Sequence, residues 1–135
     1  MTYKYHKTGI SGESEIIHKI KCPNCGKPLI KLPPNYPLFD IQCSACSFKA
    51  QVKTSNGTTL KTVLGAGWDV MKHCTKAGML IPPLIVNMKK LKKILFFPFI
   101  PKKNLNHYQL SATARRANYK MFNYRDLDKL PYFEL

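Results

Sequence analysis

The chain has 135 residues, the size of one domain, and 44% of them are hydrophobic, which is enough to fill a core. Its 22 Lys and Arg against 7 Asp and Glu give a net charge of +15. That excess is larger than the charge of about 2–8 that solubility requires, so it indicates a polyanionic partner, with nucleic acid ahead of an anionic membrane surface.

The sequence shows neither of the two signals that would direct it to or across a membrane. The first residues, 1–6, contain no apolar stretch of the kind a signal peptide needs. The longest apolar run, 94–100, is interrupted by Pro98 and is too short to span a bilayer. We therefore expect a cytoplasmic, DNA-associated protein and no membrane partner.

In chain order, the first predicted element is a short helix that begins at Ser11, a capping residue followed by two acids, and ends near Lys19. Strands are predicted over 38–42 and, by their alternating pattern, over 48–54. A turn at 55–57 follows the second strand.

The second half of the chain continues the mixture of helix and strand. Residues 67–79 have helical spacing, and 84–87 and 94–97 read as buried strands, the last at a sheet edge or ending at Pro98. From 101 onward the chain is basic and aromatic. Together these elements predict one α/β or α+β domain over residues 1–135.

Four cysteines form two C-x2-C pairs that predict a zinc-binding element over residues 22–46. Cys22 and Cys25 make the first pair, Cys43 and Cys46 the second, and residues 26–42 separate them. Two such turns bring four thiolates to one tetrahedral metal ion, and four cysteine ligands leave no open position for catalysis. We therefore expect a structural zinc ion.

A second group of residues lies on either side of the second cysteine pair. Asp40 precedes Cys43 in an apolar strand, and Gln51 and Lys53 lie on one face of the following strand. If these strands pair, a carboxylate, an amide oxygen and an ammonium group converge. This pattern is similar to a Q-x-K variant of the PD-(D/E)xK nuclease site.

In that chemistry Mg²⁺ takes oxygen ligands, here the side chains of Asp40 and Gln51 and the backbone carbonyl of Val52. Lys53 orients or deprotonates the attacking water. The catalytic residues predicted are therefore Asp40, Gln51 and Lys53. The simpler alternative is an ion pair between Asp40 and one of the many lysines, with Gln51 and Lys53 on a solvated strand face.

Three motifs together resemble the DpnI (Dam-replacing) restriction endonuclease family. Residues 22–26 resemble its C-P-N-C-G, and Asp40 to Lys53 resemble its D-x2-C-x2-C segment with the following acid-x-K strand. Residues 112–119 resemble its T-A-R-R-A-G-aromatic motif. The resemblance implies a restriction-endonuclease-like PD-(D/E)xK core with a built-in zinc element, a structural zinc ion and a catalytic magnesium ion.

The implied activity is that of a type II restriction endonuclease, a hydrolase that cleaves phosphodiester bonds in double-stranded DNA. In the third motif, Thr113, Arg115 and Arg116 are the predicted DNA contacts, since arginine suits phosphates and guanine edges.

Two departures from the family pattern bear on this expectation. Gln51 stands where the family has an acid, which removes one metal-binding charge. DpnI-type enzymes also carry a C-terminal winged helix that helps to read methylated adenine, and 135 residues leave no room for one, so methyl-adenine dependence stays open. Glu13 and Glu15 are candidates for an accessory acid at the metal site.

The rival interpretation is a non-catalytic zinc-ribbon protein that binds nucleic acid and derives from a nuclease core decayed at Gln51. A zinc-ribbon module of a larger assembly fits less well, because strands and a helix continue long after the cysteines.

Overall fold

The structure is a computed structural model that describes residues 12–34, 36, 38–109 and 120–135. Its strands are β1 (Leu29–Lys31), β2 (Ile41–Cys43), β3 (Lys49–Ser55), β4 (Thr62–Gly67), β5 (Leu84–Met88), β6 (Lys93–Phe97), β7 (Leu105–Gln109), β8 (Lys120–Arg125) and β9 (Phe133–Glu134). The helices are an N-terminal helix, described over 12–19, α2 (Trp68–Lys76) and two 3-10 turns, η1 (Lys102–Asn104) and η2 (Leu127–Lys129).

The strands form two sheets. Six of them lie in the order β1-β2-β3-β5-β6-β9, and the other three lie in the order β4-β8-β7. Among the strand pairs of the described residues, only β3–β5 is parallel, and the other pairs are antiparallel. A parallel pair needs a long crossover connection between its strands. Here that connection contains β4 and α2.

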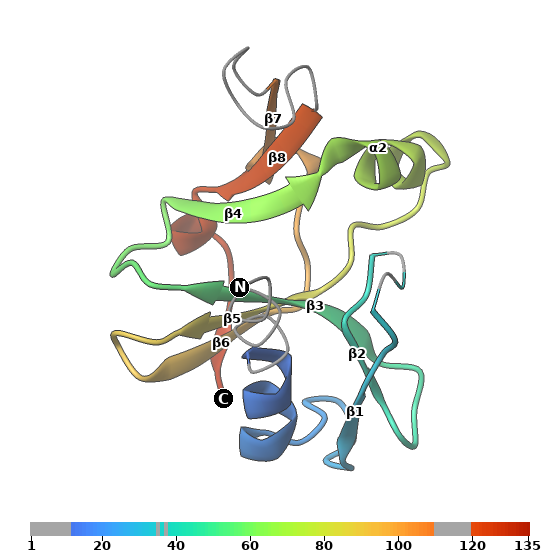
Figure 1. Ribbon diagram of the computed structural model, residues 1–135, viewed down its shortest axis with the longest axis vertical. Coiled ribbons are helices and arrows are strands. Elements are labelled where there is room, and N and C mark those ends of the chain that lie inside the picture. The colour runs from blue at the N-terminus through green and yellow to red at the C-terminus, as the bar shows by residue number, and fades with distance from the viewer. Residues whose placement is uncertain (1–11, 35, 37, 110–119) are drawn as a thin grey trace, which may run out of the picture.

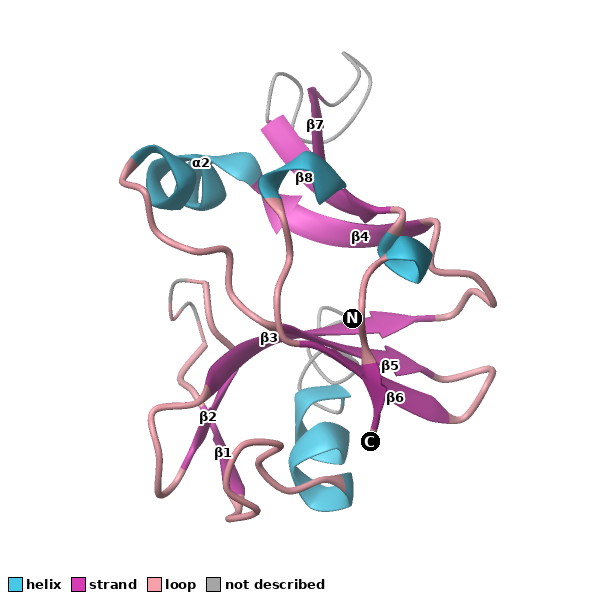
Figure 2. Ribbon diagram, turned by 180° about the vertical axis from the view of Figure 1, so that it is seen from behind, coloured by secondary structure: helices cyan, strands magenta, loops and turns pink. Residues whose placement is uncertain are grey.

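Two hydrophobic cores lie on opposite faces of the larger sheet. The N-terminal helix covers one face, and the three-stranded sheet with α2 lies over the other (Figures 1 and 2). Side chains alternate along each strand, so Val52 and Ile85 pack under the helix while Leu84 and Val86 pack between the sheets. Covered on both sides, β5 is buried at every position.

Most elements predicted for the middle of the chain are confirmed with small shifts. The helix expected over 67–79 is Trp68–Lys76, and the strands expected over 84–87 and 94–97 are Leu84–Met88 and Lys93–Phe97. The α/β class is also confirmed.

The strand expected over 38–42 is wrong in its first half. β2 begins only at Ile41, because Leu38 adopts a left-handed conformation with φ of 67° and turns the chain away from the sheet. This turn leaves part of β3 without a neighbouring strand on that side, which matters for the site.

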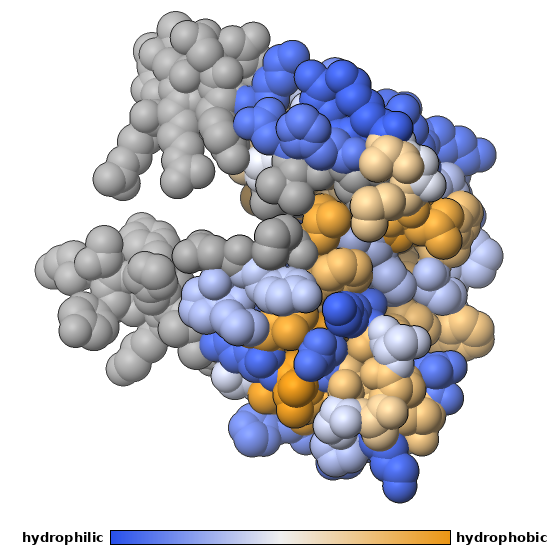
Figure 3. Space-filling model, turned by 90° about the vertical axis from the view of Figure 1, so that its right-hand side faces the viewer, coloured by the Kyte–Doolittle hydropathy of each residue, from blue (hydrophilic) through white to orange (hydrophobic). Residues whose placement is uncertain are grey.

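The surface mixes hydrophilic and hydrophobic patches. Viewed from the side that carries α2, hydrophilic side chains dominate the upper part and hydrophobic ones emerge among them below (Figure 3). Met79 and Leu80, which follow α2, are 57% and 76% exposed. Within the described ranges, no helix combines the length and hydrophobicity that a membrane span requires.

Candidate functional site

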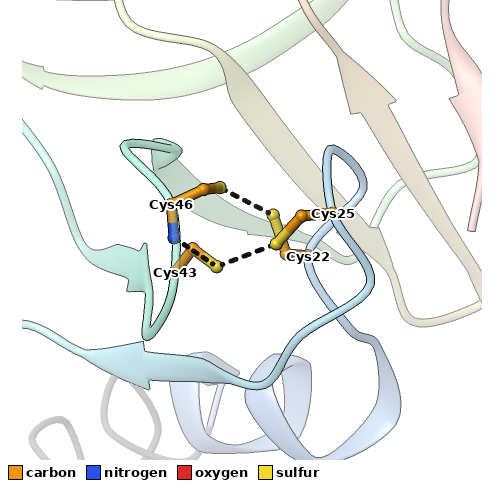
Figure 4. Close-up of side chains that lie close together, drawn as sticks. All are labelled: Cys22, Cys25, Cys43 and Cys46. Carbon is orange, nitrogen blue, oxygen red and sulfur yellow. Dashed lines mark hydrogen bonds between the residues drawn. The ribbon is translucent and has the colours of Figure 1, made fainter.

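The four predicted zinc ligands converge on one point. Their sulfurs all lie within 4.8 Å of one another, with Cys22 Sγ 3.6 Å from Cys46 Sγ and Cys25 Sγ 3.4 Å from Cys43 Sγ. A tetrahedral zinc ion with Zn–S bonds of about 2.3 Å separates its sulfurs by about 3.8 Å. The cluster therefore has the size and chemistry to hold a zinc ion, as predicted (Figure 4).

Local turns aim the sulfurs inward. In the first pair, Gly26 has a φ of 77° and donates its N–H to the carbonyl of Cys22 at 2.8 Å, which closes a tight turn that a residue with a Cβ would strain. In the second pair, the N–H groups of Ala45 and Cys46 both lie 3.3 Å from Cys43 Sγ. Hydrogen bonds from the Asn24 side chain and, to a smaller extent, from the Phe48 backbone N–H lower the pKa of Cys46 to about 6. Such donors favour the thiolates that zinc requires.

The second cysteine pair closes the hairpin formed by β2 and β3. Ile41 pairs with Ala50 and Gln42 with Lys49, and the Cys43 N–H donates to the Phe48 carbonyl at 2.8 Å. On its other side, β2 pairs with β1, where Leu29 lies opposite Cys43. The pairing of strands across this turn is confirmed.

The Asp40 side chain hydrogen-bonds to the part of β3 that β2 leaves unpaired. Its Oδ2 accepts the N–H of Val52 at 2.7 Å, and its own N–H donates to the Ala50 carbonyl at 2.9 Å. The carboxylate thus takes the place of a backbone acceptor that a longer β2 would supply.

Lys53 lies close to two acids. Burial lowers its pKa, and the charges of Asp40 and then Glu13 oppose that change. Burial likewise raises the pKa of Glu13, the nearby Asp40 charge raises it further, and Lys31 and Lys53 act against them. The Lys31 ammonium lies 3.9 Å from the Glu13 carboxylate. Two carboxylates and a partly buried amine therefore share one small region.

Gln51 is 8% exposed, and its amide oxygen accepts a hydrogen bond from the hydroxyl of Tyr124 in β8. Its backbone N–H donates to the Pro83 carbonyl at 2.9 Å. Tyr124 was not predicted as a site residue. No spacing rule reaches it, since 73 positions separate it from Gln51.

The two candidate accessory acids differ in their surroundings. Glu13 lies with Asp40 and Lys53, whereas Glu15 pairs with Lys19 at 2.7 Å and with Lys89 at 3.8 Å. Gly12 lies so close to β3 that a Cβ there would stand 2.8 Å from the hydroxyl of Thr54. This close approach sets the start of the N-terminal helix, and with it Glu13, against the strand of Lys53.

The predicted DNA contacts Thr113, Arg115 and Arg116 fall outside the described residues. A surface cavity of about 590 Å³ lies elsewhere, and its lining includes none of the predicted catalytic residues. It is lined by Glu15, Lys19, Ile20, Asn87, Lys89, Lys92, Ile94 and Leu135.

A comparison with known protein families gives a match that covers almost all of the sequence. The family described as DpnI, the Dam-replacing family, matches residues 2–133, nearly the whole chain. No curated protein matches the sequence. The family match agrees with the cysteine cluster and the motifs around it, and it indicates DNA as the substrate. The chain therefore belongs to the DpnI (Dam-replacing) family of restriction-type nucleases.

Proposed function

We propose that this protein is a Mg²⁺-dependent endonuclease of type II restriction kind that hydrolyses phosphodiester bonds in double-stranded DNA through a PD-(D/E)xK-like site. The observation that carries the proposal is the meeting of Asp40, Lys53 and Glu13 at the edge of β3 that β2 leaves open. Two acids that repel one another beside an amine destabilise the folded chain when no cation is bound. A bound divalent cation would offset that cost.

Oxygen donors for magnesium are present in this region. Asp40 supplies a carboxylate, Gln51 supplies an amide oxygen, and Val52 presents its backbone to the Asp40 side. In a strand the N–H and C=O of one residue point to the same edge, so the Val52 carbonyl also faces Asp40. We assign Glu13 as the accessory acid, which replaces the charge that glutamine at position 51 lacks. When bound, the magnesium ion would polarise the scissile phosphate and its attacking water.

Lys53 acts on the water in this proposal. Because burial lowers its pKa, its amine loses a proton more readily than that of a solvated lysine. It would hold the attacking water in line with the phosphate, accept a proton from it and, once charged, stabilise the developing negative charge.

The zinc ion has a structural role in this account. Two of its ligands lie in the turn before β1, and the other two lie at the turn that joins β2 to β3. Fixing these turns fixes the register that places Asp40 beside Val52.

The test is cleavage of methylated and unmethylated supercoiled plasmid with Mg²⁺ or Mn²⁺. We expect the wild type to nick or linearise at least one of these DNAs, and Asp40→Asn to lower the rate by about 100-fold or more. Asp69→Asn, which changes an exposed acid of α2, is the matched control and should leave the rate unchanged. A wild type that binds DNA but never cuts it would instead support the non-catalytic zinc-containing DNA-binding protein.

A further inference from the structure

The side chain of Tyr124 links the two sheets at the proposed metal site. It is 0% exposed, and its ring packs edge-on against Phe122 with ring centroids 5.3 Å apart. It belongs to β8 of the smaller sheet, yet its hydroxyl donates to the amide oxygen of Gln51 in β3 of the larger sheet. The link therefore joins parts of the chain that are distant in sequence.

The buried hydroxyl of Tyr124 needs a hydrogen-bond acceptor, and the Gln51 amide oxygen supplies one. A phenol oxygen can also accept, so a reversed amide could still donate its NH₂ to Tyr124. The Tyr124 O–H would then lose this acceptor inside the protein, and a buried donor without its acceptor is costly. The hydroxyl therefore favours the orientation in which the amide oxygen faces it.

An amide differs from a carboxylate in one respect that matters for metal binding. The two oxygens of a carboxylate are equivalent, so either can face a cation. An amide has one oxygen and one NH₂ group, and a half-turn of the side chain replaces the ligand with a donor that repels the metal. A glutamine at an acid position of a metal site therefore needs a partner that fixes its orientation.

We propose that Tyr124 is a positioning residue that locks the Gln51 amide with its oxygen available to the metal ion. The oxygen has two lone pairs, so it accepts from Tyr124 with one and keeps the other for the metal. This inference rests on the proposed function, since it assigns the partner of a proposed magnesium ligand. It explains how the site uses an amide that adds no third negative charge beside Asp40 and Glu13.

The test compares Tyr124→Phe in two backgrounds. The variant removes only the hydroxyl and keeps the packed ring. With Gln51 in place, we expect the Mn²⁺ concentration for half-maximal cleavage, and that for half-maximal thermal stabilisation, to rise about tenfold. In the Gln51→Glu background, where either carboxylate oxygen serves, the same change should shift both midpoints less than about threefold.

Tyr108→Phe, which removes a hydroxyl from the neighbouring strand β7, is the matched control and should shift neither midpoint. Equal midpoints for wild type and Tyr124→Phe would overturn the inference, and so would equal shifts in both backgrounds, which would indicate a packing effect. A wild type that neither binds Mn²⁺ nor cuts DNA would overturn the proposed function itself. The two failures are distinguishable because one appears in the wild type and the other only in the variant.

Discussion

Asp40 combines a structural and a chemical role in one carboxylate. It accepts the Val52 N–H at 2.7 Å and lies close enough to Glu13, Lys53 and Tyr124 to shift the pKa of each. Because these roles depend on different properties, hydrogen-bond acceptance and negative charge, two substitutions separate them.

We predict that Asp40→Ala lowers the free energy of unfolding by about 1–3 kcal/mol, because it leaves the Val52 N–H without its acceptor. Asp40→Asn should cost clearly less, since an amide oxygen still accepts that bond, yet it should abolish cleavage as fully as alanine. Urea unfolding of both variants, beside plasmid cleavage, checks this. Equal stability of the two variants would show that the hydrogen bond contributes little.

The Glu13 carboxylate makes folding pH-dependent. Its pKa is raised above 4.5 in the folded chain, so the folded state holds this proton more tightly than the unfolded state. The stability that the proton contributes is full below pH 4.5 and is lost as the pH rises through the higher folded value. Neutral pH therefore leaves an acid in a place that disfavours its charge.

We predict that Glu13→Gln raises the melting temperature by about 1–3 °C at pH 7 without added divalent cation, and that this gain shrinks toward pH 4.5. Glu15→Gln is the control with the opposite sign, because Lys19 lowers the pKa of Glu15 and the charge is favourable there. Thermal unfolding across this pH range measures both. A gain for Glu13→Gln that does not change with pH would contradict the assignment.

At the scale of elements, the hairpin of β2 and β3 is the unit that builds the site, and the cysteine turns hold it. We predict that Cys46→Ser lowers zinc content from one ion per chain and lowers the melting temperature by about 10 °C or more, since zinc binding is coupled to folding. Ser47→Ala, which changes an exposed residue next to Cys46, should keep the zinc content and the melting temperature of the wild type. Elemental analysis and thermal unfolding test this, and a wild type without zinc would refute it.

The hairpin was predictable because its signals are local. Cysteine spacing, the alternation of Lys49 to Ser55 and an acid three residues before Cys43 lie within a short stretch of sequence. The early start assigned to its first strand was wrong because the left-handed conformation of Leu38 depends on the loop, and residue type gives no sign of it.

The smaller sheet was not predictable in the same way. β8 carries Phe122 and Tyr124, and its partners β4 and β7 were not assigned from the sequence. The hydrogen bond from Tyr124 to Gln51 depends on how the two sheets stack on each other. Periodicity within a strand shows which face a side chain is on, but not which residue of another sheet it meets.

At the scale of the whole molecule, the net charge of +15 should control DNA affinity more than any single contact. We predict that log K falls linearly with log salt with a slope steeper than about −4, and that DNAs of different sequence give similar slopes. Fluorescence anisotropy without divalent cation, between 50 and 300 mM KCl, measures this. A slope near zero would contradict electrostatic binding of a polyanion.

Measurements of DNA cleavage and DNA binding, side by side for the wild type and Lys53→Ala, show whether this chain cuts DNA with a site built around Asp40 and Lys53. Lys61→Ala, an exposed lysine between β3 and β4, controls for the loss of one positive charge. We predict that both variants bind DNA within about threefold of the wild type, that Lys61→Ala cuts normally, and that Lys53→Ala cuts at least about 100-fold more slowly. Undiminished cleavage by Lys53→Ala, or binding without cleavage by the wild type under every metal and methylation state, would contradict the account.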